Sequence, residues 1–599
     1  MTFTPPPAVT TRPTLTGTFG MSASTHWLAT ATAQAVLERG GNAFDAAVAA
    51  AFVLHVVEPH LNGPGGDLVA LFATADDSTP VVLAGQGPAP AAATREHYLA
   101  EGLELVPGAG ALAAAVPGAV DAWVLLLVKD PGTWELAEVR AFAIGYAEDG
   151  HPVLERVCAT IRTVAGLFAE HWPTSAEQWM PGGRIPEPGE LITNPAYARV
   201  LRGLVAAGDE ASTREERVEA ARTEWATGHV AHEAAAFARI PHRHSPGTDH
   251  AGVIAEADFA AFRSGYEPAT TLEFRGFTIA KTGAWGQGPA LLETLAILDG
   301  FDEEHLDPST ELGAHTILEA QKLAYADRDA YFGEAAVPVA ELLAPGYIAE
   351  RRALIGDRAS AEFRPGAVPG VAPFLPPLRT AYRPPLSTAV AGAGEPTVSP
   401  TGETRGDTCH LDVVDRWGNI VSATPSGGWL QSSPTIPALG FCLGTRLQMT
   451  WLEEGSASTL TPGHRPRTTL TPTLVLRDGL PVLALGSPGG DQQDQWQLLY
   501  LLRTIVGGYT PQQAIDAPAF HTTSLAESFW PRTWVPAGAV VEERLPDEVI
   551  AGLEARGHVV TRAGAWTLGR LSSVGRDPAT GVLSAAANPR GMQGYAAGR

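Results

Sequence analysis

The sequence predicts an α+β protein, because segments with helical periodicity and short β-type runs both recur along its 599 residues. A second observation is a Pro- and Gly-rich segment at about 336–405, which has little periodicity and is typical of a long exposed linker. A third is a hairpin pattern that follows this linker directly. Length alone suggests roughly four domains, but that prior is soft.

The predicted elements before the linker are mostly helices. A helical period over 25–39 is closed by Gly40 and Gly41, since glycine commonly ends a helix. The small residues of 43–57 predict a second helix suited to close packing, and its apolar run is too short to span a bilayer. The other predictions are strands at 68–72 and 81–84, mainly helices over 116–236, a strand pair over 270–281, and helices at 289–300 and 312–331.

Strands dominate the pattern after the linker. The hydroxyl residue Thr408 opens a β-type run, a Gly-Asn turn follows at Gly418, and a second run returns at 420–424. The hairpin therefore carries a hydroxyl side chain at its leading edge. Further strands are predicted at 471–476 and 482–485, a helix at 495–506 and a mixed strand region over 559–575.

Thr408 is the leading candidate for a catalytic residue. If the chain were cut between Asp407 and Thr408, the hydroxyl and the new α-amino group would lie on one residue and act as nucleophile and base. A lone Thr in a strand is most often structural, because β-branched residues favour strands. Cys409 is the rival nucleophile by chemistry, yet adjacent side chains of a strand point to opposite faces, so only one of the two can face a site.

Four segments carry a resemblance to a known family. They are DTCHLDVVD at 407–415, GGNAFDAAVAAA at 40–51 with VEPH and GPGG after it, KLAYADR at 322–328, and GSPGG at 486–490. In this order they resemble the γ-glutamyltranspeptidase family of N-terminal-nucleophile hydrolases. The likeness runs from about Thr18 to the C-terminus.

This resemblance implies a four-layer αββα sandwich of the N-terminal-nucleophile hydrolase type. It also implies a precursor that is cleaved between Asp407 and Thr408. A large subunit, 1–407, and a small subunit, 408–599, would then form one α+β unit and be each other's partners.

The resemblance assigns the catalytic groups as well. Thr408 is the implied nucleophile, Ser426 the hydroxyl residue that hydrogen-bonds to it, and Gly489 with Gly490 the oxyanion hole; Cys409 becomes a small packed residue. Two backbone N–H groups at a tight turn can hold an oxyanion without a charged side chain. From the residues alone, Gly489 and Gly490 fit a plain β-turn equally well, and Ser426 fits a turn serine.

Three residues fall where relatives bind the substrate carboxylate. Thr468 and Thr469 match the family's hydroxyl pair, and Arg95 matches its carboxylate-binding arginine. An isolated Arg is usually a solvated surface group, but its planar fork suits a carboxylate bidentately. We therefore expect a carboxylate on the acyl group.

The family's groups for a donor α-amine are replaced in this chain. Gly428 stands where relatives have an Asn, and Gln448 and Met449 stand where they have an acidic pair, with Arg446 just before them. An ammonium group there would lose its carboxylates and face a cation. We expect a dicarboxylic acid monoamide to be preferred over γ-glutamyl compounds. The alternative is that another acid, Glu453 or Glu454, serves the amine.

Composition narrows the partners. The chain has 41 Lys and Arg against 65 Asp and Glu, a net charge of −24, which argues against nucleic acid or an anionic membrane. Three cysteines without paired spacing predict neither a disulfide framework nor a zinc site, and we expect no metal and no cofactor. The N-terminus lacks the pattern of a secretory signal, so cytoplasmic residence is the default expectation, although many members of the family are exported.

Two weaker patterns in the sequence do not indicate a functional site. His242, His244, Asp249 and His250 form a local cluster, but their spacing fits no known ligand helix and flanking prolines mark a loop. The run GAGALA at 108–113 resembles a dinucleotide fingerprint, but it follows a Pro and lacks a well-placed acidic partner.

The predicted reaction is acyl transfer from a small-molecule amide to Thr408, resolved by water or an amino acceptor. One alternative is another amidase of the same fold, such as a cephalosporin-acylase-like or oxamate-hydrolase-like enzyme. An alternative from a different class is an unprocessed, inactive relative that serves as a scaffold.

Overall fold

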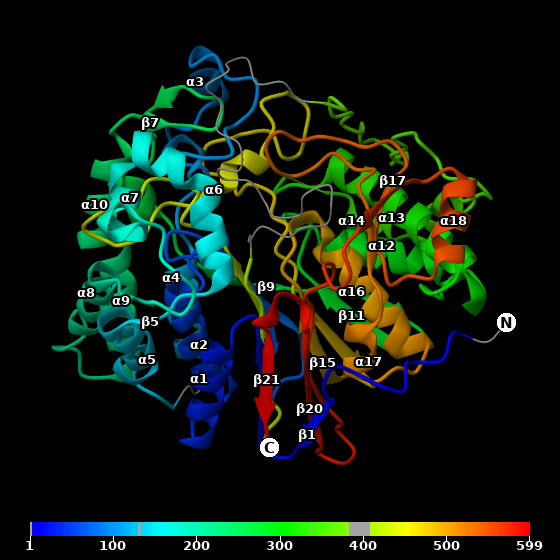
Figure 1. Cartoon of the computed structure of the whole chain (residues 1–599), viewed down its shortest axis with the longest axis horizontal. Coiled ribbons are helices and arrows are strands. Elements are labelled where there is room, and N and C mark those ends of the chain that lie inside the picture. Colours follow the sequence, from blue (N-terminus) through cyan, green and yellow to red (C-terminus); the bar gives the residue numbers. More distant parts are fainter. Residues whose placement is uncertain (1–2, 130–132, 336, 382–407) are drawn as a thin grey trace.

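Two facing β-sheets form the centre of the computed structural model, which describes residues 3–129, 133–335, 337–381 and 408–599 (Figure 1). One seven-stranded sheet has the order β21-β2-β12-β13-β3-β4-β9 and the other β1-β20-β19-β15-β14-β11-β10. Both sheets are antiparallel at every described pairing and combine strands from before and after residues 382–407. The strands are β1 Leu15–Gly17, β2 Gly20–Ser24, β3 Asp67–Ala73, β4 Val81–Gly85, β9 Gly265–Pro268, β10 Thr270–Phe274, β11 Phe277–Lys281, β12 Leu411–Asp415, β13 Ile420–Ser426, β14 Thr473–Arg477, β15 Leu480–Gly486, β19 Ser572–Arg576, β20 Leu583–Ala587 and β21 Tyr595–Gly598.

Helices cover the outer face of each sheet (Figure 1). The two helical layers and the two sheets give the predicted four layers. On the sheet that contains β12 these helices are α1 Trp27–Glu38, α2 Ala43–Val57, α4 Ala119–Lys129, α5 Leu136–Asp149, α8 Pro195–Ala206 and α9 Arg214–Thr227, and on the other sheet they are α12 Gly288–Leu298, α13 Glu311–Tyr331, α16 Gln493–Leu501, α17 Pro511–Asp516 and α18 Asp547–Arg556.

The remaining elements lie around this sandwich. They are the helices α3 Arg95–Ala100, α6 Glu155–His171, α7 Pro173–Trp179, α10 His229–Ala238, α11 Glu256–Ala261, α14 Val339–Leu342 and α15 Pro345–Arg352, and the strands β5 His151–Pro152, β6 Leu191–Ile192, β7 His242–Arg243, β8 Asp249–His250, β16 Phe520–Thr522, β17 Gly538–Glu542 and β18 Val559–Ala563. In the described part of the chain, no helix is long and apolar enough to cross a membrane.

Side chains alternate between the two faces of β12 and β13, and this alternation determines the layer in which each side chain packs. Val413 and Val421 pack outward against the helices, whereas Val414 and Ile420 pack between the two sheets. Each such burial contributes about 1.5–3 kcal/mol. A slip of one residue in the pairing would exchange the two faces of a strand and place its polar side chains against the apolar layers. The hairpin register is therefore firmly set.

Helix α2 ties the turn of this hairpin to the helical layer. The Asn42 side chain accepts hydrogen bonds from the N–H groups of Phe44 and Asp45, and the Asp45 carboxylate accepts from the Asn42 N–H, which forms a capping box. The Ala43 N–H donates to the carboxylate of Asp415 at 2.9 Å. Asp415 ends β12, so one carboxylate holds both the hairpin turn and the start of α2.

The predicted linker differs from the structure in its first part. The helices α14 and α15 lie within residues that were expected to lack regular structure. Both are short, and α15 starts with Pro345 at its first helical position, where a proline costs no hydrogen bond. Residues 382–407 of the linker, with the expected cleavage residue Asp407, lie outside the described residues.

Candidate active site

Thr408 and Ser426 face each other at the open end of the β12–β13 hairpin. Their backbones form an antiparallel bridge, and their hydroxyl oxygens lie 3.2 Å apart. Both side chains are buried. The structure thus brings together Thr408, the predicted nucleophile, and Ser426, the residue predicted to form a hydrogen bond with it.

The same face of the hairpin continues as a ladder of polar pairs. Asp412 lies opposite Ser422, whose hydroxyl donates to it at 2.8 Å, and His410 lies 2.9 Å from both Thr424 Oγ1 and Asp412 Oδ1. A buried polar group is costly unless it is hydrogen-bonded. The ladder satisfies these groups between two sheets and holds the start of the hairpin rigid.

Cys409 points to the opposite face, as expected from strand alternation. Its thiol donates to Glu58 Oε2 at 2.9 Å and accepts from Asn62 Nδ2 at 3.1 Å. Burial and the neighbouring Glu58 carboxyl raise the pKa of the Cys409 thiol well above its usual value. A thiol in this state is a poor nucleophile.

The glycine loop follows β15 and lies against the hairpin. The Ser422 hydroxyl oxygen lies 3.0 Å from the Leu485 carbonyl oxygen, a second acceptor besides Asp412 for its one proton. A Cβ atom on Gly486 would lie 2.1 Å from Cε1 of His410, so only glycine lets the strand approach the polar ladder this closely. The loop that begins there contains Gly489 and Gly490, at φ +132° and +54°. These are conformations that glycine adopts with little cost.

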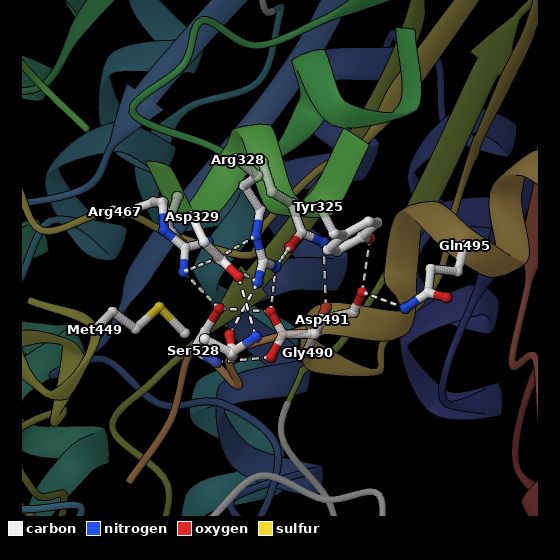
Figure 2. Close-up of polar contacts among 12 residues, drawn as sticks. Tyr325, Arg328, Asp329, Met449, Arg467, Gly490, Asp491, Gln495 and Ser528 are labelled. Carbon is white, nitrogen blue, oxygen red and sulfur yellow. Dashed lines mark hydrogen bonds and ion pairs between the residues drawn. The ribbon is translucent and has the colours of Figure 1, made fainter. Parts of the chain in front are cut away.

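A buried ion-pair network fixes the residue after the glycine pair (Figure 2). The Asp491 carboxylate pairs with Arg328 and accepts a hydrogen bond from the backbone N–H of Ser528 at 2.9 Å. The backbone carbonyl of Asp491 accepts a hydrogen bond from the Tyr325 hydroxyl at 2.8 Å. Burial acts to raise the pKa of Asp491, but Arg328 and then Arg467 outweigh it, and the net pKa is lowered. The carboxylate is therefore charged and pins the loop.

This network gives the KLAYADR segment a structural role, because two of its residues hold Asp491 in place. Tyr325 and Arg328 belong to that segment, and both reach across to Asp491. Sequence reasoning recognised the motif but missed the role of its members and of Asp491. The role follows from burial, because every described side chain of α13 from Gly313 onward is buried, Arg328 included, and the sequence alone does not reveal this.

Thr468 and Thr469 lie beside the same loop. The Thr468 N–H donates to the Trp285 carbonyl at 2.9 Å. The side-chain amide of Gln493, oriented to satisfy both contacts, donates to the carbonyls of Ser487 and Thr469 at 3.2 and 3.1 Å. Gln493 thus connects the hydroxyl pair to the glycine loop, and the buried Thr469 Oγ1 has no hydrogen-bond partner among the described residues.

Comparison with known proteins places this arrangement in a family. The family profile described as Gamma-glutamyltranspeptidase matches residues 29–598. The chain belongs to the γ-glutamyltranspeptidase family. It is 30% identical to the glutathione hydrolase-like YwrD proenzyme of Bacillus subtilis strain 168, over 96% of this chain and 98% of that protein.

Solved structures of similar proteins share the fold. The structure named LmbA2991HD is 52% identical with a TM-score of 0.92, and the match covers 99% of this chain and 100% of that one. A cephalosporin acylase from Bacillus halodurans is 28% identical with a TM-score of 0.81, covering 99% and 98% of the two chains. The predicted N-terminal-nucleophile hydrolase fold is confirmed, and the protein is an enzyme of the γ-glutamyltranspeptidase family.

Arg95, the residue matched to the family's carboxylate-binding arginine, contacts a different part of the chain. Its Nε donates to the Leu452 carbonyl, and its Nη1 lies 3.0 Å from a Glu454 carboxylate oxygen. The described contacts of Arg95 therefore join α3 to residues 452–454 rather than to Thr468 and Thr469. Its role in binding substrate stays a prediction.

Arg446 is paired with an acid that sequence reasoning did not single out. Its Nη2 donates to Asp67 Oδ1 at 2.8 Å, its Nε donates to Asp67 Oδ2, and both side chains are buried. The sheet register sets Asp67 opposite Ser426. A neutral ion pair, rather than a lone cation, thus lies one strand away from Thr408 and Ser426.

The histidines near residue 245 have structural partners. The ring of His244 accepts from the Leu112 N–H at Nε2, while its Nδ1 lies 2.8 Å from the His242 carbonyl. A Cβ atom on Gly110 would lie 2.3 Å from this ring, so the glycine at this position lets the backbone pack against His244. These contacts give both segments a packing role.

A different group has the spacing of metal ligands. The ligand atoms of His315, Glu319 and His558 lie within 4.8 Å of one another. Glu319, however, pairs with Lys322 and Arg364, and His315 Nδ1 lies 2.9 Å from His558 Nε2. Two cations already neutralise the only carboxylate of this group, so an added metal ion would have to displace them.

Proposed function

We propose that this enzyme is an autoprocessed amidohydrolase or acyltransferase that uses Thr408 as its N-terminal nucleophile. The observation that carries the proposal is the position of Thr408, which is buried beside Ser426 on the inner face of the hairpin, the face whose His410 packs against Gly486 at the start of the glycine loop. Relatives named proenzymes support a cleaved precursor. Cys409 is excluded by its orientation and its raised pKa.

Maturation would convert one amide bond into a free amine. The Thr408 hydroxyl attacks the carbonyl carbon of Asp407, the C–N bond breaks as the C–O ester bond forms, and the nitrogen takes up the hydroxyl proton. Water then hydrolyses the ester, which leaves a carboxylate on Asp407 and an α-amine on Thr408. Residues 1–407 and 408–599 become the two subunits.

Turnover would use the same hydroxyl on an external amide. The new α-amine has a reference pKa of about 7.7–8.0, so a neutral fraction exists near neutral pH and accepts the Thr408 proton. That proton passes to the leaving amine when the acyl–threonine ester forms. The N–H groups of Gly489 and Gly490 stabilise the oxyanion, and water or an amino acceptor releases the acyl group.

The acyl group we propose carries a carboxylate and no free α-amine. Gly428, Gln448 and Met449 offer no acid for an ammonium group, and the nearby Asp67 is neutralised by Arg446. The likeness to a protein named cephalosporin acylase supports an amide substrate outside the γ-glutamyl class. A γ-glutamyl hydrolase is the second candidate, favoured by the name of the YwrD relative and by the acids Glu453 and Glu454 near Arg95.

Denaturing gel electrophoresis with N-terminal sequencing tests the proposal. The purified protein should give two bands, the smaller beginning at Thr408, and Thr408→Ala should give one. Cys409→Ala is the matched control and should still give two bands. A small fragment that begins at another residue would refute the nucleophile assignment, and a single intact band in the wild type would favour the scaffold alternative.

A further inference from the structure

Arg467 is a buried arginine with an unused donor beside the glycine loop. Its side chain is almost fully buried, and its Nη2 donates to the Ser528 hydroxyl at 2.7 Å. Its Nη1 has no hydrogen-bond partner among the described residues. A buried N–H without an acceptor is unfavourable, so an anion bound beside the glycine loop would stabilise Arg467 by accepting a hydrogen bond from this group.

A second arginine repeats the pattern. Arg532 donates from Nη2 to the carbonyls of Gln448 and Thr450 at 2.9 and 3.0 Å, and its guanidinium carbon lies 3.8 Å from the ring centroid of Trp451. Its Nη1 is also buried without a partner in the described part of the chain. Burial, followed by the charge of Arg467, lowers the pKa of Arg532 to about 9, so both arginines are protonated at neutral pH.

The local charges do not balance among the described residues. Arg328, Arg467 and Arg532 share two aspartates, Asp329 and Asp491. The other acid that acts on Arg532 is Glu453, which has its own partner, Arg379. One buried positive charge is left uncompensated, and a bound anion would offset it.

Arg467 lies close to the residues that follow the glycine pair. Figure 2 shows Arg467 and Ser528 on one side of Asp491, with Gly490 next to it and Met449 nearby. Arg467 also directly precedes Thr468 and Thr469 in the chain. A planar guanidinium is the side chain best suited to a carboxylate.

We propose that Arg467, supported by Arg532, binds the carboxylate of the acyl group and thereby selects amides of short dicarboxylic acids. Arg467 is then a specificity residue, in place of Arg95, which is occupied by Leu452 and Glu454. The identity of the substrate in this inference rests on the proposed function. The binding of an anion at Arg467 does not. Arg467 touches the substrate, and Arg532 adds to the positive potential behind it.

Paired substrates provide the kinetic test. Wild-type enzyme should hydrolyse glutaryl 4-nitroanilide with a higher kcat/KM than butyryl 4-nitroanilide, which lacks only the carboxylate. Arg467→Met should lower kcat/KM for the glutaryl compound by about 30-fold or more and leave the butyryl value within about threefold. Arg467→Lys should recover part of the loss, since it keeps the charge but not the fork.

A matched control separates recognition from general loss of a buried arginine. Arg140 is also fully buried, its three guanidinium nitrogens have no hydrogen-bond partner among the described residues, and it lies over Phe52 in the opposite helical layer. Arg140→Met should keep the glutaryl preference. If Arg140→Met and Arg467→Met lower both anilides equally, or if Arg95→Met alone removes the preference, the proposal is overturned.

Binding without turnover tests the site independently of the chemistry. Glutarate should raise the Tm of the wild-type protein more than butyrate does, and Arg467→Met should abolish that difference. If the enzyme cleaves itself at Thr408 and hydrolyses both anilides alike, the anion site fails and the proposed function stands. If it hydrolyses neither anilide but glutarate still raises Tm through Arg467, the anion site stands and the proposed function fails.

Discussion

The hydroxyl oxygens of Thr408 and Ser426 lie 3.2 Å apart across the first bridged pair of the hairpin. This distance allows a hydrogen bond in either direction. The pair is buried above His410 and Thr424, so a change at Ser426 should act on Thr408 without disturbing the rest of the ladder.

Ser426→Ala should slow both maturation and turnover. Loss of a hydrogen bond in a buried site costs about 1–3 kcal/mol, which corresponds to roughly 10- to 100-fold in rate. The measurement is the time course of subunit formation on a gel, followed by kcat of the mature enzyme. Ser426→Thr keeps a hydroxyl and should restore most of the rate. Wild-type kinetics in Ser426→Ala would show that Thr408 is oriented by other contacts.

Gly490→Ala should lower kcat by about 100-fold or more while the protein still folds, because one oxyanion donor typically contributes that much. Gly490 has φ +54°, where an added Cβ costs roughly 1–2 kcal/mol and displaces the backbone N–H. Gly489→Ala is the harsher change, since its Cβ would lie 2.3 Å from the Trp496 ring. Unchanged kcat in a folded Gly490→Ala protein would return this loop to a structural role.

Local chemistry explains which parts of the fold could be predicted from the sequence. The helix over 43–57 and the hairpin after Thr408 were found where expected, because capping residues and turn glycines act over a few positions. The alternation argument that separated Thr408 from Cys409 is confirmed by the contact of Cys409 with Glu58. Strand β21, which pairs with β2 across almost the whole chain, was missed because no local pattern encodes that pairing.

The site was harder to predict, since its charges meet through tertiary packing. Nothing near Arg446 in the sequence points to Asp67, and nothing near Asp491 points to Arg328. Arg467 and Arg532 were not singled out at all, because an isolated arginine in a sequence carries no sign of burial. The pattern of hydrophobic residues predicts helices and strands, but it does not predict ion pairs between distant segments.

The Cys409 thiol should be chemically silent in the folded enzyme. All three cysteines are buried, and burial raises the pKa of each thiol. A thiol reagent such as 5,5′-dithiobis(2-nitrobenzoate) should label none of them at pH 8 until the protein is unfolded, when all three react. Rapid labelling of native protein together with loss of activity would reopen Cys409 as a nucleophile, and Cys409→Ala controls for its identity.

Asp491→Asn should destabilise the protein in a pH-dependent way. Removing one member of a buried ion pair costs about 3–5 kcal/mol, here because Arg328 and Arg467 lose one of the two aspartates that they share. The folded pKa of Asp491 is lowered from the ordinary value of 3.8, so its stabilisation is present above that pH and is lost as the pH falls through the folded pKa. The difference in unfolding free energy between the two proteins should shrink below about pH 3.8.

Denaturant titrations of wild type and Asp491→Asn at pH 7, 5 and 3 measure this difference. The pKa of the neighbouring Asp329 is raised by burial and also by the charge of Asp491, so part of the measured difference comes from Asp329. A difference that does not shrink at pH 3 would mean that folding does not lower the pKa of Asp491.

The Arg446–Asp67 pair makes a prediction about the donor amine. Asp67 lies opposite Ser426 in the sheet, so its carboxylate is within one strand of the proposed nucleophile, and Arg446 neutralises it. Arg446→Gln frees this acid to bind an ammonium group. We expect the ratio of kcat/KM for γ-glutamyl over glutaryl 4-nitroanilide to rise by about 10-fold, the equivalent of 1.4 kcal/mol. Arg446→Lys keeps the cation and should keep the wild-type ratio.

The double variant Asp67→Asn, Arg446→Gln identifies the acid responsible. It should lose the gain, because the carboxylate that attracts the amine is gone while the space left by Arg446 is the same. A gain that persists in the double variant would assign the amine to Glu453 or Glu454 instead. A wild-type enzyme that already prefers the γ-glutamyl compound would show that the amine site survives despite Arg446, and the preference for acyl groups without an amine would be wrong.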